Sequence, residues 1–286
     1  MADDTILITG AGSGIGKLTA LTLAKMGKNV IATTETEFQA DVLKADAEAL
    51  KIPMIVEKID ITNPADRKKA WKWNIDILVN NAAVKEGGAL VDIPEENLRK
   101  QYEVNVFGTM LFTQEFARKM VRKRKGRIVF ISSISGLMVN PFSGPYSSSK
   151  FAIEGMASTL SQELKEFGVE VAIVNPGPFL TGFNDREFNR WRTWKDDSSK
   201  RIFNYENLAF PFKQLNPQKV VAPTIKVILG KTKAYRNLSP KFMIPFVKLV
   251  NEFQWIKRTN WRLGKRHLMV QQSYNMKPGS SGKYMM

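Results

Sequence analysis

Residues 5–16 read Thr5-Ile6-Leu7-Ile8-Thr9-Gly10-Ala11-Gly12-Ser13-Gly14-Ile15-Gly16. The first five residues form a short apolar, β-branched run, which is typical of a buried parallel strand. A glycine-rich turn follows, and a helical apolar pattern then extends to Gly27, before a second strand at 29–33. This order predicts a βαβ unit, whose glycines let the backbone approach a pyrophosphate at the N-terminus of the helix.

The same alternation continues along most of the chain. After the strands at 5–9 and 29–33 we expect strands at 54–59, 75–80, 127–132 and 169–174, and helices at 38–50, 64–71, 94–119 and 146–167. This alternation predicts a single α/β domain, a Rossmann-type doubly wound parallel sheet with helices on both faces. Ligands of such sheets lie beyond the carboxyl ends of the strands. The strand ends at Thr9/Gly10, Asn80, Ser133 and Asn175 therefore predict one shared site.

Composition excludes several other classes of protein. The 286 residues include no cysteine and one histidine, His267, so thiolate metal sites, disulfides and a histidine-based triad or metal site are not expected. The acidic start and the absence of a long apolar run predict no secretory signal and no membrane span, hence a cytoplasmic protein. Much of the net charge of +16 lies at residues 231–286, where twelve Lys or Arg accompany one acid, Glu252.

Tyr146 and Lys150 stand four residues apart at the start of the predicted helix 146–167. One helix face therefore carries both side chains, roughly 6 Å apart. A lysine cation at that distance favours phenolate over phenol, and a helix N-terminus acts in the same direction. Taken alone, the pair also fits an ordinary solvated helix face.

Motifs in a characteristic order identify a family. Thr9–Gly16 looks like a T-G-x-x-x-G-x-G turn, Asn80-Asn81-Ala82-Ala83 like N-N-A-G with alanine in the last place, Tyr146 to Lys150 like Y-x-x-x-K, and Pro176-Gly177 with Thr181 like P-G-x-x-x-T. Over roughly residues 5–230 the chain thus resembles the short-chain dehydrogenase/reductase family. Its C-terminal part is similar to that of steroid and retinol dehydrogenase-like members.

The resemblance implies four catalytic residues: Asn105, Ser133, Tyr146 and Lys150. Tyr146 would protonate a substrate carbonyl or deprotonate an alcohol, and Lys150 would assist it while binding the nicotinamide ribose. Ser133 would donate a hydrogen bond to the reacting oxygen, a preorganised contact that stabilises developing charge. Asn105 would hold a water that relays protons from Lys150. Hydride moves at the nicotinamide, which the protein only has to orient.

The resemblance also implies a cofactor site without a metal. Its residues would be Gly10, Ser13, Gly14, Ile15, Gly16, Thr34, Asp60, Ile61, Asn80, Ala82, Tyr146, Lys150, Pro176, Gly177 and Thr181. At the end of the second strand Thr34 takes the place of the expected aspartate and Glu35 follows it. A carboxylate repels a 2′-phosphate, so we expect NAD, with NADP as the open alternative.

Two regions distinguish the chain from a minimal family member. Residues 182–217 are expected to form a helical lid, whose aromatic residues either line an apolar pocket or pack among themselves. With Met138, Phe142 and Phe179 beside the site, they predict a bulky apolar alcohol or ketone as substrate. The aromatic residues of the lid are Phe183, Phe188, Trp191, Trp194, Phe203, Tyr205, Phe210 and Phe212.

Residues 231–286 form a basic, aromatic C-terminal extension to a catalytic domain at 1–230, and the usual last strand ending in Asp-Gly-Gly is missing from the sequence. Three interpretations compete: packing on the body or on another subunit, peripheral contact with an anionic membrane surface, and nucleic-acid binding. We rank the last lowest, because no nucleic-acid module is recognisable, and expect no such partner. The resemblance also predicts a homo-oligomer, a dimer or tetramer, assembled through the helices at 94–119 and 146–167.

The sequence as a whole predicts an NAD(P)-dependent alcohol dehydrogenase or carbonyl reductase. Two alternatives stay open: an NADPH-dependent 3-oxoacyl reductase, and a dinucleotide-sensing binding protein without catalysis. The complete set Asn105, Ser133, Tyr146 and Lys150 favours an enzyme, because a sensor has no need of a proton relay.

Overall fold

Parallel strands joined by helices account for most of the chain. The computed structural model describes residues 4–185, 190–194, 201–205, 210 and 212–259. Within these ranges one seven-stranded sheet has the order β3-β2-β1-β4-β5-β6-β7, with every neighbouring pair parallel. The strands are β1 (Thr5–Ile8), β2 (Asn29–Thr34), β3 (Ile55–Lys58), β4 (Ile77–Asn80), β5 (Gly126–Ile131), β6 (Val169–Pro176) and β7 (Arg236–Ser239). The predicted Rossmann-type fold is confirmed.

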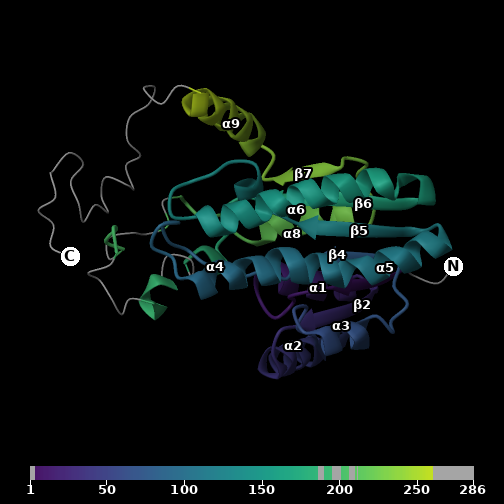
Figure 1. Ribbon diagram of the computed structural model, residues 1–286. Helices are drawn as coiled ribbons and strands as arrows, with labels where there is room; N and C mark the ends of the chain where they lie inside the picture. The colour runs from purple at the N-terminus through teal and green to yellow at the C-terminus, as the bar shows by residue number, and fades with distance from the viewer. Residues whose placement is uncertain (1–3, 186–189, 195–200, 206–209, 211, 260–286) are drawn as a thin grey trace, which may run out of the picture.

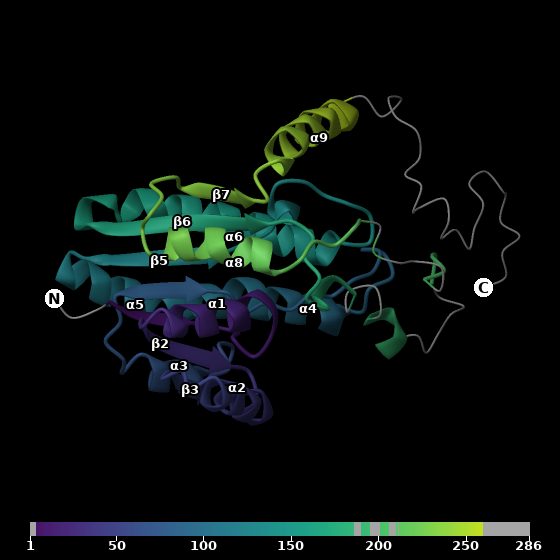
Figure 2. The same cartoon turned by 180° about the vertical axis from the view of Figure 1, so that it is seen from behind.

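Helices cover both faces of the sheet. Figure 1 shows α4 (Glu95–Tyr102), α5 (Thr109–Lys123) and α6 (Gly144–Glu163) in front of it. Figure 2, from behind, shows α1 (Gly14–Lys25), α2 (Glu37–Ala49) and α8 (Gln218–Ile228) on the opposite face, and α3 (Pro64–Ala70) beside β3. The strand order reverses between β1 and β4, and ligands of such sheets bind beyond the carboxyl ends of the strands at this point.

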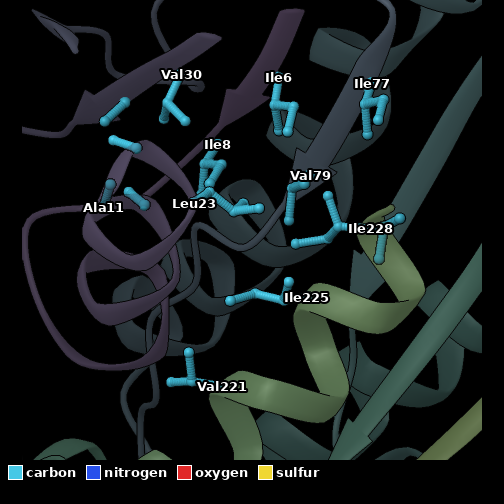
Figure 3. Close-up of a cluster of buried hydrophobic side chains, with 14 of the residues drawn as sticks. Ile6, Ile8, Ala11, Leu23, Val30, Ile77, Val79, Val221, Ile225 and Ile228 are labelled. Carbon is cyan, nitrogen blue, oxygen red and sulfur yellow. The ribbon is translucent and has the colours of Figure 1, made fainter. Parts of the chain in front are cut away.

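The sheet separates two hydrophobic cores. On the α1/α8 side, side chains such as Ile8, Val79 and Leu23 pack with Ile225 and Ile228 of α8, as Figure 3 shows. On the other side, Phe112 and Phe116 of α5 and Ile153 of α6 pack against strand residues that include Leu78 and Phe130. Strands buried on both faces carry continuous apolar runs, which is why their positions could be predicted.

Helix starts follow from local side-chain chemistry. The Thr36 hydroxyl accepts a hydrogen bond from the backbone of Gln39 at the start of α2. Asn63 Oδ1 accepts from the backbone amides of Ala65 and Asp66 at the start of α3, where Pro64 occupies the first turn. These contacts satisfy amides that have no partner within the helix.

The helix predicted at 94–119 has an interruption. After α4 the backbone forms a π-helical turn at Glu103–Gly108 before α5 begins at Thr109. Such a turn holds one more residue than an α-helical turn, and it often accompanies a functional site. Here it contains Asn105.

The prediction of six strands without a last edge strand is wrong. β7 pairs with β6 over residues 236–239, although its sequence Arg-Asn-Leu-Ser lacks an apolar run and no Asp-Gly-Gly follows it. β7 is held by its parallel pairing with β6, in which Ile173 lies opposite Arg236 and Pro176 lies opposite Ser239. A four-residue edge strand needs little intrinsic β-propensity when its partner is already fixed.

After β7 the helix α9 (Met243–Thr259) stands beyond the edge of the sheet (Figure 1). Its Val247 is buried, whereas four large apolar side chains remain exposed on or next to it: Phe242, Phe246, Leu249 and Phe253. No helix in the described ranges is long and apolar enough to cross a membrane. Trp261 lies outside those ranges, and membrane contact of the extension stays a prediction, as does homo-oligomer formation.

Candidate active site

A cleft opens at the carboxyl ends of the central strands, with about 1170 Å³ of empty space that includes open solvent. It is lined by the turn after β1 and by the segments that follow β4, β5 and β6. Fourteen of the predicted site residues line this one cleft: Gly10, Ser13, Gly14, Ile15, Gly16, Asp60, Ile61, Ala82, Ser133, Tyr146, Lys150, Pro176, Gly177 and Thr181. Of the strand ends predicted to share one site, Gly10 and Ser133 line this cleft, whereas Asn80 and Asn175 do not.

Glycines in the first turn are required by close backbone contacts. Gly10 has a positive φ of 64°, and a Cβ there would lie 2.6 Å from the Ala82 Cα atom. A Cβ on Gly16 would lie 2.6 Å from the Gly10 carbonyl oxygen and would overlap the Asn81 side chain. The two loops are thus packed backbone against backbone, and the turn presents its main chain to the cleft.

Asn81 and Thr9 join these loops by hydrogen bonds. Asn81 Nδ2 donates to the carbonyl oxygens of Thr9 and Gly10, both at 2.9 Å. The Thr9 hydroxyl accepts from the amides of Asn81 and Ala82 at 3.0 and 3.1 Å. The turn after β4 is therefore fixed although alanine replaces the last glycine of its motif.

The outer end of the cleft differs from the prediction in one respect. Thr34 is fully buried, donates from its hydroxyl to the Thr36 carbonyl at 3.0 Å, and does not line the cleft. Glu35 and Gln39 line it instead. Thr34 is the last residue of β2, and Glu35, which follows the strand, is exposed at the cleft.

Asp60 and Asn80 shape the cleft in different ways. Asp60 Oδ1 accepts from the backbone and the hydroxyl of Thr62, at 2.8 and 2.7 Å, while Asp60 itself lines the cleft. Asn80 does not line it, because its side chain is buried and donates to the Thr113 hydroxyl at 2.8 Å. Asn80 therefore anchors β4 to α5 instead of facing a ligand.

Tyr146 and Lys150 occupy one face of α6, and both are buried in the floor of the cleft. Lys150 Nζ lies 5.6 Å from the centre of the Tyr146 ring and donates to the Ile131 carbonyl oxygen at 2.9 Å. Burial lowers the pKa of Lys150 from 10.5 to about 8, because the cation has lost its hydration. The Glu154 carboxylate raises that pKa in part, and the Lys85 cation lowers it further.

Ser133 follows β5 at the same depth and begins a short 3₁₀ turn at Ile134–Gly136. Its hydroxyl oxygen accepts a hydrogen bond from the Ser135 amide at 3.1 Å. That contact fixes the oxygen atom and leaves the hydroxyl hydrogen able to point at a ligand in the cleft.

Asn105 is buried in the π-helical turn, behind the cleft. Its amide forms a pair of hydrogen bonds with the backbone of Val84, at 2.8 and 3.0 Å, and donates to the Ser149 hydroxyl at 3.1 Å. Ser149 in turn donates to the Tyr146 carbonyl oxygen at 2.7 Å. Asn105 thus holds the backbone around Tyr146, and its role in a proton relay stays a prediction.

A charged group that no sequence motif indicated lies directly behind Lys150. Glu154 lies one further helical turn along α6 and is 7% exposed. Its carboxylate accepts from Asn175 Nδ2 at 2.5 Å and from Arg236 Nη2 at 2.6 Å. Asn175 also donates to the Ser133 carbonyl oxygen at 3.1 Å. The four-residue spacing between Tyr146 and Lys150, continued by four residues, would have predicted Glu154. No local sequence pattern predicts that Arg236 contacts it.

A second missed residue is Lys85, which follows the Asn80–Ala83 motif. Its side chain is 6% exposed, and Nζ lies 4.9 Å from the centre of the Tyr146 ring. Nζ donates to Asn184 Oδ1 at 2.9 Å, in the segment that follows β6. Two lysines thus flank the same tyrosine ring, one from its own helix and one from the loop after β4.

The aromatic residues of the 182–217 segment divide between the two roles that the sequence left open. Phe183 lines the cleft, with its ring 5.8 Å from that of Tyr146, and Phe210 and Phe212 line an adjoining cavity. The others form a cluster, in which Trp194, Phe203 and Tyr205 pack with Phe142 and Ala89, and Phe210 also packs against it. Phe188 lies outside the described residues, as does the side chain of Trp191.

Asp92 fastens that cluster to the body. Its carboxylate accepts from the Tyr205 hydroxyl at 2.8 Å and from the amides of Ile202 and Phe203. The Tyr205 oxygen also accepts from the Ala89 amide at 3.1 Å. Burial raises the pKa of Tyr205, so this hydroxyl stays protonated. Of the other expected flanking residues, Phe179 lines the cleft, whereas Met138 and Phe142 are buried elsewhere.

The model of the family described as short chain dehydrogenase matches residues 4–192. This chain belongs to the short-chain dehydrogenase family. A 3-ketodihydrosphingosine reductase of Bacteroides thetaiotaomicron is 33% identical over 258 residues, covering 87% of this chain and 92% of the relative. Human retinol dehydrogenase 8 is 30% identical, covering 79% and 78%. The predicted resemblance is confirmed, and the chain is a short-chain oxidoreductase.

Solved structures show the same fold. A short-chain dehydrogenase/reductase of Burkholderia phymatum in complex with NAD has a TM-score of 0.73 at 23% identity, covering 89% of this chain and 95% of that one. A short-chain dehydrogenase of Sphingobium yanoikuyae in complex with NADPH has a TM-score of 0.70 at 21% identity, covering 92% and 98%.

Proposed function

We propose that this short-chain dehydrogenase interconverts a ketone and a secondary alcohol on a bulky apolar substrate, with NAD(H) as the cofactor. The observation that carries the proposal is the position of Tyr146 and Lys150. Both line the same cleft as the glycine turn. A dinucleotide at that turn and a carbonyl at Tyr146 would therefore share one space.

The residues present fit a dinucleotide. The turn at Gly10–Gly16 is so closely packed that a Cβ at Gly10 or Gly16 would collide with neighbouring atoms, so its backbone can approach a ligand. The turn leads into the N-terminus of α1, which favours phosphate. Asp60, Ile61 and Thr181 line the remainder of the cleft. Glu35 lines its outer end, and a carboxylate there disfavours a 2′-phosphate, which supports NAD(H) over NADP(H). When bound, the cofactor supplies the hydride.

The protein then has to hold the carbonyl and move a proton. Tyr146 would give its hydroxyl proton to the carbonyl oxygen during reduction and accept it during oxidation. The buried Lys150 cation, 5.6 Å from the ring centre, supports the negative charge that this transfer leaves on the tyrosine. Ser133 would donate a second hydrogen bond to the same oxygen, which stabilises the charge that develops there.

The walls around Tyr146 support the proposed substrate class. Phe179 and Phe183 line the cleft, and Phe210 and Phe212 line the cavity beside it. Aromatic walls of this kind favour a large apolar group over a small polar sugar. The relative named as 3-ketodihydrosphingosine reductase supports a ketone as the reacting group.

The test is a screen of long-chain and aromatic ketones and secondary alcohols with NADH, NAD, NADPH and NADP, followed by nicotinamide absorbance. Tyr146→Phe should abolish turnover because the proton donor is lost, and NADH should bind within about twofold of the wild-type affinity. A Tyr146→Phe enzyme that turns over at the wild-type rate would falsify the assigned role. Activity restricted to sugars or short hydroxy acids would refute the substrate class.

A further inference from the structure

Beside the cleft, a second cavity that is partly open to solvent begins at Ser133. One part of its wall is polar, with Lys85, Ser135, Asn140 and Asn184, and the other is apolar, with Phe210 and Phe212. Ser133 and Asn184 line both spaces, so the second cavity continues the first next to the reacting position. A substrate held by Ser133 and Tyr146 would therefore extend past a lysine as well as past aromatic rings.

Lys85 is the charged group of that wall. Its side chain is 94% buried, and Nζ is held at 2.9 Å from Asn184 Oδ1. The rings of Tyr146, Phe210 and Phe183 lie 4.9, 5.3 and 5.9 Å from Nζ. These contacts place the cation beside the tyrosine that we assign to the carbonyl oxygen, within the length of a few bonds of a reacting carbon.

A buried ammonium has a strong preference for an anion that comes within contact distance. Charges interact much more strongly in the low dielectric of a protein interior than in water. A charge-assisted hydrogen bond contributes about twice as much as a neutral one. A purely apolar substrate would gain nothing from Lys85, and a cationic substrate would be repelled by it.

We propose that Lys85 is the anion-binding residue of the substrate site and that the natural substrate is an amphipathic oxo compound. Its oxyanion, a carboxylate, sulfonate or phosphate, lies a few bonds from the reacting ketone, and its apolar chain packs on Phe210 and Phe212. The inference rests on the proposed ketone–alcohol activity and specifies which substrates that activity selects.

Two other roles for Lys85 make different predictions. If the lysine only joins the rings and Asn184, its loss would damage the site for every substrate. If it acts only by lowering the pKa of Lys150, its loss would change the pH profile equally for all substrates. Only an anion-binding lysine distinguishes a charged substrate from its neutral counterpart.

The experiment compares 4-oxodecanoate with its methyl ester, two ketones that differ in one charge. The enzymes are wild type, Lys85→Met, Lys85→Arg and, as a control, Lys219→Met, which changes an exposed lysine at the start of α8. We expect wild type to prefer the acid in kcat/KM by about tenfold to a hundredfold, the range for a hydrogen bond to a charged group. Lys85→Met should remove that preference, Lys85→Arg should keep part of it, and Lys219→Met should leave it unchanged.

A binding measurement separates this inference from the proposed function. Decanoate and methyl decanoate carry no ketone, so their binding to each enzyme by calorimetry does not require turnover. Decanoate should bind wild type about tenfold more tightly than Lys85→Met, with no such difference for the ester. Equal losses for both members of either pair, or no preference by wild type, would overturn the role of Lys85. Decanoate binding without turnover of either ketone would instead refute the proposed reaction.

Discussion

Arg236 of the edge strand β7 donates a hydrogen bond of 2.6 Å to Glu154 of α6. The other oxygen of Glu154 accepts from Asn175, and Asn175 also donates to the carbonyl oxygen of Ser133. One buried carboxylate therefore connects the last strand, the helix that carries Tyr146 and the backbone of the serine assigned to the reacting oxygen. Its negative charge also opposes the effect of burial on Lys150.

The first prediction concerns that charge. Because Glu154 raises the pKa of Lys150, Glu154→Gln should move that pKa below about 8. The reaction needs Lys150 charged, so the alkaline limb of the kcat profile should move to lower pH. The pH profile of ketone reduction measures this shift. Glu163→Gln, which changes an exposed acid at the end of the same helix, should leave the profile in place. A profile that Glu154→Gln lowers without shifting would indicate a structural role alone.

The second prediction concerns the effect of Lys150 on how the free energy of unfolding changes with pH. The pKa of Lys150 is about 8 in the folded protein and takes its usual value of 10.5 in the unfolded chain. Between these two pH values the unfolded chain therefore binds more protons than the folded protein. The free energy of unfolding should therefore rise with pH in that window, by up to about 1.4 kcal/mol per pH unit, while below pH 8 the full cost of burial is present. In Lys150→Met this rise should be missing.

Urea unfolding of both proteins at about pH 7.5 and about pH 9.5 measures that difference directly. Other groups that titrate in this range are shared by the two proteins and largely cancel in the comparison. Curves that stay parallel for wild type and Lys150→Met would contradict the lowered pKa.

The third prediction compares the effect on stability of replacing two different glycines by alanine. Gly16→Ala should destabilise the protein by about 1–3 kcal/mol, because the new methyl group meets the Gly10 carbonyl and an Asn81 side chain held by two hydrogen bonds. Gly155→Ala, in the middle of α6, meets no atom within 4 Å and should stabilise it by about 0.4–1 kcal/mol. Thermal unfolding measures both, and two changes of equal sign would contradict the packing of the turn.

The fourth prediction concerns cofactor choice. Glu35 lines the outer end of the cleft, so Glu35→Arg should replace repulsion of a 2′-phosphate by attraction. The ratio of the dissociation constants for NADPH and NADH should fall by about tenfold or more, equivalent to about 1.4 kcal/mol. Glu37→Arg, which changes a nearby exposed acid that does not line the cleft, should leave the ratio nearly unchanged. An unchanged ratio in Glu35→Arg would place the ribose away from this residue.

Local patterns predicted most of the fold. The strands at Thr5–Ile8 and Gly126–Ile131 are apolar on both faces, and the glycine turn has a backbone that other residues cannot follow. β7 escaped prediction because its order depends on pairing with β6 and not on its own four residues.

The site was predicted where a residue acts through its own helix or turn, and it was missed where two distant segments meet. Tyr146 and Lys150 are neighbours on one helix, so their spacing placed both side chains together, and the other motifs indicated their role. The position of Lys85 in the site depends on Asn184 and Phe210, which follow it by about a hundred residues and pack against it only in the folded chain. The cleft position predicted for Thr34 belongs to Glu35, because a motif does not determine whether the last residue of a strand or the next residue faces the cleft.

The π-helical turn at Glu103–Gly108 places a constraint on the length of the chain. Gln101 before the turn and Asn105 within it both donate to the Ser149 hydroxyl, and after the turn Phe112 and Phe116 pack against the sheet. Removal of one residue between these groups would turn one set by about 100° relative to the other. The chain could then keep either the packing of Phe112 and Phe116 on the sheet or the hydrogen bonds of Gln101 and Asn105 to Ser149, but not both. Lineages of this protein should therefore vary in sequence between Asn105 and Phe112 more readily than they vary in length.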